Sequence, residues 1–156
     1  GVAMTYDELY QYAIFMLSRR DYGTTELKRR LARRINEVDK AKQSTTDERC
    51  LEQVIERLLE GQYLDDNRTV YAFFRRYLSK SYGPLRIRQE LQQKGFPSEI
   101  IARVLEETET DWYALCQDLK EKKFGTGKPK DFKERAKQIR YLQYRGFTSD
   151  YINALF

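Results

Sequence analysis

The chain has 156 residues, enough for one ordinary domain or for a few small modules that share cores. It contains no histidine, and Cys50 and Cys116 are not part of a CxxC pair, so no metal cluster, disulfide framework or histidine-dependent nucleophile can be assigned. Hydrophobic residues make up 40%, charged residues 34%, and the formal charge is +5. The composition suits amphipathic helices with charged outer faces. The positive charge favours polyanions or acidic protein surfaces as partners without choosing between them, and many ordinary soluble proteins share it.

The first part of the chain is predicted to be helical from the spacing of its apolar residues. Leu27 and Leu31 stand one helical turn apart within a strongly basic segment. Thr45 and Glu48 have the spacing of a capping box ahead of an apolar run, which predicts a helix from about Thr46 to Glu60. No element is expected for the first three residues.

Prolines and glycines mark the helix boundaries in the middle of the chain. Pro84 suits the first turn of a helix that ends at Gly95, and Pro97 can open the next helix, which continues to about Thr108. Apolar residues at helical spacing predict three further helices, which contain Trp112, Leu115, Cys116 and Leu119 in the first, Ile139 and Leu142 in the second, and Tyr151, Ile152 and Leu155 in the short last one.

Short sequence motifs recur along the chain. LQQKGF at Leu91–Phe96 returns as LQYRGF at Leu142–Phe147, and each copy ends a basic helix with Gly at the expected C-cap and an aromatic residue that can pack back. An aromatic residue followed by glycine also recurs between helices, at Tyr22-Gly23, Tyr82-Gly83 and Phe124-Gly125. These recurrences indicate one helical unit written three times.

The sequence therefore predicts an all-α fold of about nine helices, arranged as three tandem three-helix repeats in an elongated, curved stack. The expected repeats cover residues 5–64, 65–109 and 110–156. Two polar stretches, Asn36 to Thr45 and Gly125 to Asp131, are expected to be exposed loops.

Charge is distributed by helix. The expected third helices are acidic: Asp47 to Asp66 holds seven acids and two bases. The second helices are basic, and Lys120 to Arg145 holds ten bases and three acids. We predict that the second helices form a cationic ridge that meets phosphates or acidic protein surface. The candidate partner-binding residues are Lys28, Arg29, Arg30, Arg33, Arg34, Arg75, Arg76, Arg86, Arg88, Lys94, Lys133, Lys137, Arg140 and Arg145.

Other interpretations of these patterns stay open at this point. The basic and acidic helices can instead pair with each other and solvate the surface, with no partner involved. Six tyrosines near basic positions can stack on nucleic-acid bases, although we favour a role in the core for most of them. They are Tyr10, Tyr12, Tyr71, Tyr77, Tyr141 and Tyr144.

We find no constellation of residues that predicts catalysis. The GK pair in FGTGKP, at Phe124–Pro129, lacks both the GxxxxGK[ST] frame and the preceding apolar strand of a phosphate-binding loop. Asp65 and Asp66 are adjacent carboxylates, but their place ahead of a helix favours N-capping over metal binding. We therefore expect no enzyme activity, no metal and no cofactor.

Three further motifs are YLDDNR at Tyr63–Arg68, YGPLRIRQELQQKGF at Tyr82–Phe96 and YLQYRGF at Tyr141–Phe147. These motifs resemble those of the RecX family of bacterial regulators of the RecA recombinase. The resemblance extends from about Tyr6 to Phe156, and the middle motif is quite specific. It supplies no agreed set of contact residues, so the candidate residues rest on charge alone.

The resemblance implies tandem three-helix repeats that bind RecA and lie in the groove of the RecA filament on DNA. It also implies limited filament extension and lower ATP hydrolysis and strand exchange by RecA, without catalysis by the protein itself. The expected partners are thus RecA, the RecA–DNA filament and, as an alternative, single- or double-stranded DNA directly. A helical-repeat adaptor for another acidic protein is a further alternative. We expect no membrane span, because no apolar run is long enough to cross a bilayer. We also expect the protein to be a monomer and to lie in the cytoplasm.

Overall fold

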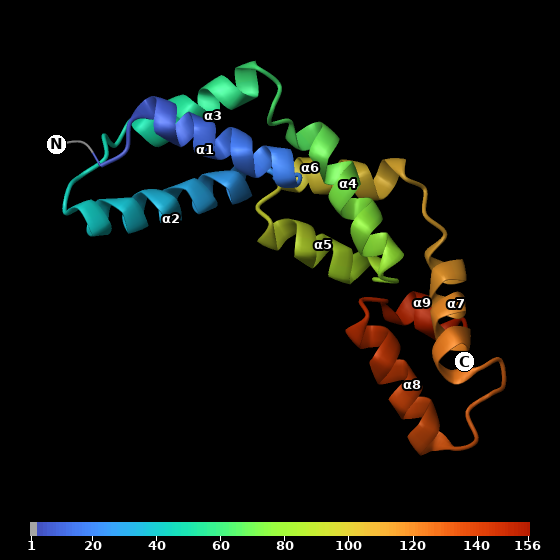
Figure 1. Cartoon of the computed structure of the whole chain (residues 1–156). Coiled ribbons are helices and arrows are strands. Elements are labelled where there is room, and N and C mark those ends of the chain that lie inside the picture. The colour runs from blue at the N-terminus through green and yellow to red at the C-terminus, as the bar shows by residue number, and fades with distance from the viewer. Residues whose placement is uncertain (1–2) are drawn as a thin grey trace. The chain divides into compact units, whose positions relative to one another are not determined.

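The computed structural model describes residues 3–156, and within that range it contains nine α-helices and no strand (Figure 1). The helices are α1 (Tyr6–Arg19), α2 (Thr24–Lys42), α3 (Cys50–Glu60), α4 (Asp66–Ser79), α5 (Pro84–Gln93), α6 (Ser98–Glu107), α7 (Trp112–Phe124), α8 (Phe132–Tyr144) and α9 (Ser149–Asn153). The all-α fold predicted from the sequence is confirmed. The curvature of the predicted stack stays a prediction.

Contacts divide the chain into two compact units. The first contains the residues up to Ala72 together with Lys94–Phe96, and the second contains Phe73–Gln93 with Pro97–Phe156. Helix α4 contributes to both units. This division groups residues by contact and does not test the predicted repeat boundaries at 64 and 109, which stay a prediction.

In the first unit, α1, α2 and α3 pack against one another around one core (Figure 1). Each helix presents an apolar stripe to that core, because its apolar residues return every three or four positions. The fully or nearly fully buried members are Leu9, Ala13, Leu27, Leu31, Val54, Ile55, Leu58 and Leu64.

In the second unit, α7, α8 and α9 enclose a smaller core, and α5 packs on α6. The core between α7, α8 and α9 contains Cys116, Leu119, Leu142, Phe147 and Ile152. Phe147 is 2% exposed, so the aromatic residue of the LQYRGF motif does pack back onto its own helix, as its sequence predicts.

Two predictions about the first unit are wrong. Asn36 to Lys42 is not a loop, because α2 continues to Lys42, and Ile35 and Val38 extend its apolar stripe against the core; only residues 43–45 of the predicted loop lie outside the helix. The third helix begins at Cys50 rather than near Thr46. Thr46 is instead buried, and its hydroxyl donates to Asp39 Oδ1 at 2.6 Å and accepts from the backbone N–H of Met4 at 3.2 Å. These tertiary hydrogen bonds outweigh the local capping pattern.

Most other boundary predictions are confirmed. Pro84 is the first residue of α5, and Pro97 directly precedes α6. Gly95 and Gly146 have φ angles of +86° and +100°, the left-handed conformation that a glycine C-cap supplies. The stretch 125–131 lies between helices, as expected. Gly1 and Val2 lie outside the described residues, whereas Ala3 is buried and its carbonyl accepts from Lys42 Nζ at 2.9 Å.

Candidate functional site

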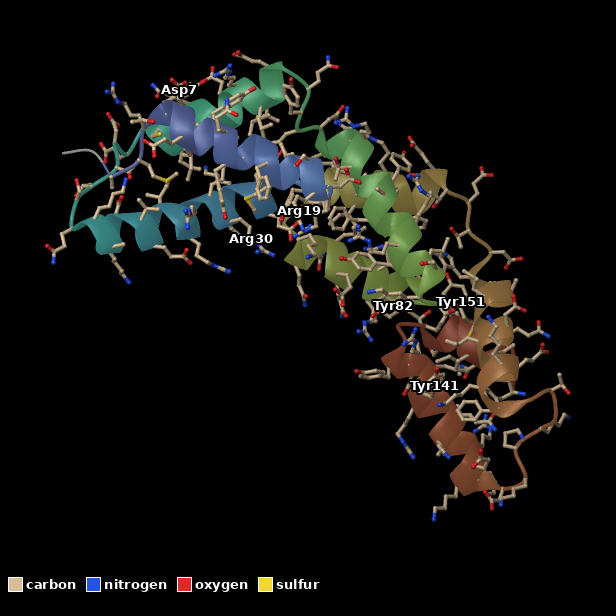
Figure 2. The ribbon with its side chains drawn as sticks, viewed as in Figure 1. Asp7, Arg19, Arg30, Tyr82, Tyr141 and Tyr151 are labelled. Atoms are coloured by element: carbon tan, nitrogen blue, oxygen red, sulfur yellow. The ribbon has the colours of Figure 1, made fainter. Side chains whose placement is uncertain are left out.

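Helix α2 carries the densest group of the predicted cations. Its apolar stripe faces the core, so the arginines between the stripe residues face solvent. Arg29, Arg30, Arg33 and Arg34 are exposed, and Figure 2 shows Arg30 on this helix. Lys28 is only half-exposed and forms an ion pair with Glu52 of α3. The structure therefore brings four of the five α2 residues together as an exposed cationic face.

A small hollow lies within this face, with a volume of about 160 Å³. Arg30, Arg33 and Arg34 line it together with Tyr12 of α1, and the guanidinium carbon of Arg34 lies 5.1 Å from the centroid of the Tyr12 ring. Glu37 is the single acid in the lining. Three guanidinium groups beside one carboxylate leave a net positive charge, which attracts anionic groups such as phosphates or carboxylates.

The cations of α4 and α5 fall into two groups. Arg75, Arg76 and Arg88 are exposed, and the Arg76 guanidinium carbon lies 5.0 Å from the Phe73 ring centroid. Arg86 is half-buried and forms an ion pair with Glu90, with its Nε 3.4 Å from Glu90 Oε1. Its guanidinium carbon also lies 4.2 Å from the centroid of the Tyr82 ring. Arg86 thus has a structural role that its sequence position alone does not reveal.

Two matching contacts, one in each unit, join a Tyr-Gly segment to a basic-Gly-Phe segment. We call the contact of residues 22–26 with Lys94–Phe96 the first joint, and the contact of residues 82–86 with residues 145–147 the second joint. In the second joint, the N–H of Gly83 donates to the carbonyl of Arg145 at 2.8 Å, and the N–H of Leu85 donates to the carbonyl of Gly146 at 3.1 Å. The first backbone N–H groups of a helix have no acceptor within that helix. These two bonds supply acceptors for such groups at the start of α5.

At the first joint, the acceptor for a backbone N–H at the start of α2 is a side-chain carboxylate rather than a backbone carbonyl. Asp66 Oδ1 accepts from the N–H of Thr24 at 2.8 Å. Its neighbour Asp65 accepts from the N–H of Arg68 at 3.3 Å and so caps its own helix. The capping interpretation of the two aspartates is confirmed, although Asp66 caps a helix distant in sequence.

The two joints balance charge differently. Glu26 lies in the first joint, and its carboxylate contacts both Arg20 and Lys94, each at 3.0 Å. Arg86 occupies the corresponding place in the second joint, where the guanidinium groups of Arg86 and Arg145 both lie against the Tyr82 ring, at 4.2 and 4.8 Å from its centroid. The first joint thus combines an ion-pair triad with one cation–π contact, in which the Arg20 guanidinium carbon lies 3.6 Å from the Tyr22 ring centroid, whereas two cation–π contacts share one ring in the second joint.

The environment of Glu26 lowers the pKa of its carboxyl group. Burial acts to raise this pKa, but the hydrogen bonds and positive charges of Arg20 and Lys94 outweigh burial, so the carboxyl group stays ionised to lower pH.

The contacts of the two joints engage Lys94 and Arg145, both of which were predicted as partner-binding residues. The paired Tyr-Gly and Gly-Phe motifs were the sequence signal for this role.

Helix α8 carries the remaining predicted cations on its outer side. Lys133, Lys137 and Arg140 are exposed, and within residues 3–156 none of them forms an ion pair. The opposite side of α8 buries Gln138 and Leu142. Lys120 of α7 is 7% exposed, and its Nζ donates to the carbonyl of Gly127 at 3.1 Å, a structural role that the sequence did not indicate.

The tyrosines near basic positions mostly serve packing, as we favoured from the sequence. Tyr77 is 5% exposed, and Tyr141 packs edge-on against Phe124, with ring centroids 5.4 Å apart (Figure 2). Tyr10 stacks on Tyr6 and lies under Arg57. Tyr144 differs, because it is 72% exposed, and Phe132, which we did not single out, is 88% exposed.

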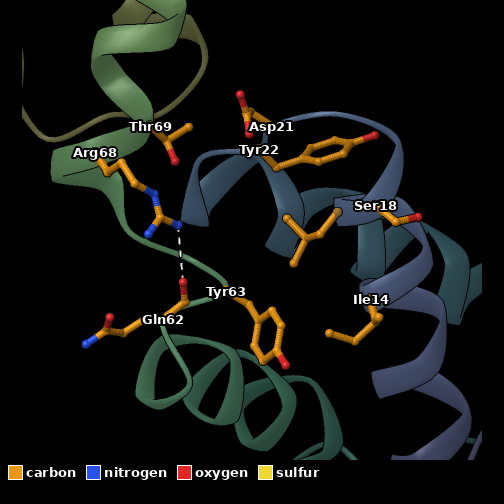
Figure 3. Close-up of a pocket in the computed structure, with 9 residues that line it drawn as sticks. Ile14, Ser18, Asp21, Tyr22, Gln62, Tyr63, Arg68 and Thr69 are labelled. Carbon is orange, nitrogen blue, oxygen red and sulfur yellow. Dashed lines mark hydrogen bonds between the residues drawn. The ribbon is translucent and has the colours of Figure 1, made fainter.

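A separate pocket of about 330 Å³ opens in the first unit between α1 and the start of α4 (Figure 3). Tyr22 and Tyr63 line it from different sides, and Arg68 is held beside it by a hydrogen bond to the carbonyl of Gln62 at 3.1 Å (Figure 3). Ser18 also lines the pocket, but its hydroxyl donates to the carbonyl of Phe15 at 2.6 Å. The Ser18 hydroxyl is thus engaged by a backbone carbonyl of its own helix.

The thiols and carboxylates do not form a reactive or metal-binding centre in the part of the chain that the structure describes. Cys50 and Cys116 are buried and free, and burial raises the pKa of both thiols, that of Cys116 to about 11. Both thiols are therefore protonated near neutral pH. The described residues contain no group of three or more Cys, Asp or Glu side chains placed to hold a metal ion.

Comparison with known proteins identifies the family. The model of the third RecX three-helix domain matches residues 109–156, and that of the second matches residues 65–105. A regulatory protein RecX from Vibrio parahaemolyticus is 42% identical over 141 residues, which cover 90% of this chain and 84% of the relative. The chain belongs to the RecX family. A regulatory protein RecX from Halorhodospira halophila is 37% identical over 142 residues, covering 91% of this chain and 82% of that relative.

A solved structure of RecX agrees with the fold. The crystal structure of RecX from Lactobacillus salivarius superposes with a TM-score of 0.75 and covers 96% of this chain and 93% of its own, at 20% sequence identity. Membership of the RecX family supports a regulatory role for this protein. Within residues 3–156, no helix is both long and apolar enough to span a membrane.

Proposed function

We propose that this protein binds the RecA filament on DNA and lowers RecA activity by limiting filament extension, ATP hydrolysis and strand exchange. The observation that carries the proposal is the exposed arginine face of α2 in a member of a regulatory family. Arg30 and Arg33 stand at the hollow beside Tyr12, with a single carboxylate in the lining, so a partner's anionic groups gain the attraction of guanidinium groups that the fold leaves unneutralised.

Repetition adds to this attraction. The exposed cations of α2, α4, α5 and α8 offer several weak contacts on one chain, and a filament offers several copies of each acceptor. Linked weak contacts raise the overall affinity through effective concentration, without any single strong contact. Inhibition requires that the protein bind one filament state more tightly than the others, because only differential affinity shifts an equilibrium.

The test is a pull-down against three targets: RecA filaments on DNA, bare DNA and free RecA, together with RecA ATPase and strand-exchange assays. The double variant Arg30→Glu with Arg33→Glu should lose filament binding and inhibition while it keeps its thermal stability, because both residues are exposed. The matched control is Arg49→Glu with Lys122→Glu, which changes the net charge equally at exposed residues outside the candidate set. Full inhibition by the α2 variant would contradict the proposal.

The same experiment separates the alternatives. A direct DNA-binding module would bind bare DNA as well as it binds the filament, and an adaptor for another acidic protein would bind neither DNA nor filament. We propose the bacterial cytoplasm as the place of action, since RecA works on chromosomal DNA there, and a monomer as the active form, which light scattering at working concentration would test.

A further inference from the structure

The second joint gathers three cations around one aromatic ring, that of Tyr82 (Figure 2). Three cationic centres lie 4.2, 4.8 and 6.0 Å from the centroid of this ring, and they belong to Arg86, Arg145 and Lys80 respectively. All of these residues are part of the second unit. The Debye length at physiological salt is about 8 Å, so charges that share one ring repel each other with little screening. An anion among them would relieve that repulsion.

The second joint contains little negative charge of its own. The carboxylate that the structure pairs with one of these cations is that of Glu90, whose Oε1 lies 3.4 Å from Arg86 Nε. Within residues 3–156, neither Lys80 nor Arg145 forms an ion pair. Lys80 is also exposed, so a dissolved ligand can reach it. Two positive charges at this joint are therefore available to an anion from solution.

Arg145 is less completely hydrogen-bonded than Arg86. The Arg86 guanidinium group donates to the Tyr82 hydroxyl at 3.3 Å and to the Tyr144 carbonyl at 3.4 Å. Arg145 Nη2 donates to the carbonyl of Lys80, but Arg145 Nε is buried and has no hydrogen-bond partner in the part of the chain that the structure describes. A buried donor on a charged group is costly without an acceptor. An anion beside the Arg145 guanidinium group would offset that cost by neutralising its charge.

The first joint shows which anion such an arrangement accepts. Glu26 Oε2 lies 3.0 Å from a nitrogen of Arg20 and 3.0 Å from Lys94 Nζ. Residues 20, 22 and 26 correspond to residues 80, 82 and 86 at a constant offset, and Lys94 corresponds to Arg145 in the repeated LQQKGF and LQYRGF motifs. The second joint thus keeps both cations and the tyrosine but has an arginine in place of the glutamate. A carboxylate is the group that the matching joint places between its two cations.

We infer that the second joint binds a carboxylate from solution, held by Lys80 and Arg145 in the role that Glu26 has in the first joint. A guanidinium group matches the planar geometry of a carboxylate, and an ammonium group adds a compact second charge. Lys80 lies between α4 and α5, and Arg145 lies between α8 and α9, so the bound carboxylate joins these two turns. This assignment goes beyond the proposed action on RecA and does not depend on it.

The test follows the Nε–H signal of Arg145 in proton–nitrogen NMR spectra of the full chain, where burial protects this group from exchange with water. The signal is assigned by its absence from the spectrum of Arg145→Lys. Sodium glutamate should shift it saturably, whereas sodium chloride at the same ionic strength should not. Lys80→Gln should weaken glutamate binding about 3- to 10-fold, the effect of losing one exposed charged contact. The matched control Lys122→Gln removes an exposed lysine elsewhere in the second unit and should bind glutamate as the wild type does.

Two substitutions at position 86 test the comparison between the joints. Arg86→Glu places a carboxylate of the chain itself at the position that corresponds to Glu26, so added glutamate should no longer shift the Arg145 signal. Arg86→Gln removes the same cation without supplying a carboxylate, so the response should remain. Equal responses of these two variants would contradict the correspondence. Lys80 is exposed, so the result for Lys80→Gln stands whatever the position-86 variants do to stability.

Further ligands identify the source of the carboxylate. A tetraglutamate peptide that binds far more tightly per carboxylate than glutamate does would identify an acidic peptide, and equal affinity per carboxylate would identify a small molecule. A shift of the Arg145 signal by sodium phosphate but not by glutamate would overturn the inference. An equal shift by chloride, or a wild-type response in Lys80→Gln, would also overturn it. Inhibition of the RecA ATPase is measured separately, so each of these results leaves the proposed function to its own test.

Discussion

Lys94 and Glu26 are far apart in the sequence, yet Lys94 Nζ lies 3.0 Å from Glu26 Oε2, and the same carboxylate also contacts Arg20. The Glu26 side chain is 11% exposed, whereas those of Arg20 and Lys94 are 30% and 34% exposed. One nearly buried carboxylate thus holds two partly exposed cations where α2 begins. This triad assigns a structural role to a lysine that charge alone marked as a partner contact.

Replacing Glu26 should destabilise the protein. Glu26→Gln leaves two cations beside a neutral amide, and we expect the free energy of unfolding to fall by about 1–3 kcal/mol, as for loss of a partly buried charged hydrogen bond. Urea denaturation measures the change. Glu52→Gln removes the exposed carboxylate that pairs with Lys28, and it should change the free energy of unfolding by less than about 0.5 kcal/mol. Equal effects of the two substitutions would refute the role assigned to the triad.

The triad also predicts a pH dependence. The pKa of Glu26 is lower in the folded protein than its ordinary value of 4.5, because Arg20 and Lys94 outweigh burial. A lowered carboxyl pKa stabilises the folded state fully above the unfolded-state value, and this contribution is lost as the pH falls through the folded value. The difference in unfolding free energy between wild type and Glu26→Gln should therefore be constant near neutral pH and shrink below about pH 4.5. A difference that stays flat into acid would show that the carboxylate charge is not the cause.

The second joint depends on glycine. Gly146 has φ +100°, and a Cβ there would overlap the Arg86 side chain and lie 2.6 Å from its backbone nitrogen. We expect Gly146→Ala to lower the free energy of unfolding by about 2–4 kcal/mol, from backbone strain and steric overlap together. Gly127→Ala is the matched control, since a Cβ there meets nothing within 4 Å. Thermal melting that ranks the two variants equally would contradict this view of the joint.

Burial should make Cys116 slow to react. Its pKa is raised to about 11 and its side chain is fully buried, so at pH 8 the thiolate fraction is about 100-fold below that of a thiol with the ordinary pKa of 9.0. Reaction with a thiol-specific disulfide reagent should therefore be slow in the folded protein and become fast in urea. The single variant Cys50→Ala isolates the signal of Cys116. A fast reaction in the folded state would show that the core around Cys116 opens readily.

The sequence determined the helices wherever local chemistry decides them. Pro84 cannot continue a preceding helix and fits a first turn, and Gly95 and Gly146 adopt the left-handed conformation that ends a helix. Periodic apolar residues fixed which side of each helix is buried. The local rule failed at Thr46, the predicted first residue of the third helix, because hydrogen bonds to Asp39 and Met4 hold Thr46 ahead of that helix, and a local capping pattern includes neither residue.

The candidate site divides in the same way. Residue type alone located the cations of α2 and α8, since arginine and lysine between apolar stripe positions face solvent. Only the tertiary structure decided that Lys94, Arg86 and Arg145 serve the joints and that Phe132 and Tyr144 stay uncovered. The reason is physical: an ion pair, a cation–π contact or an uncovered ring depends on which distant residues the fold brings within a few ångströms, and sequence spacing does not contain that distance.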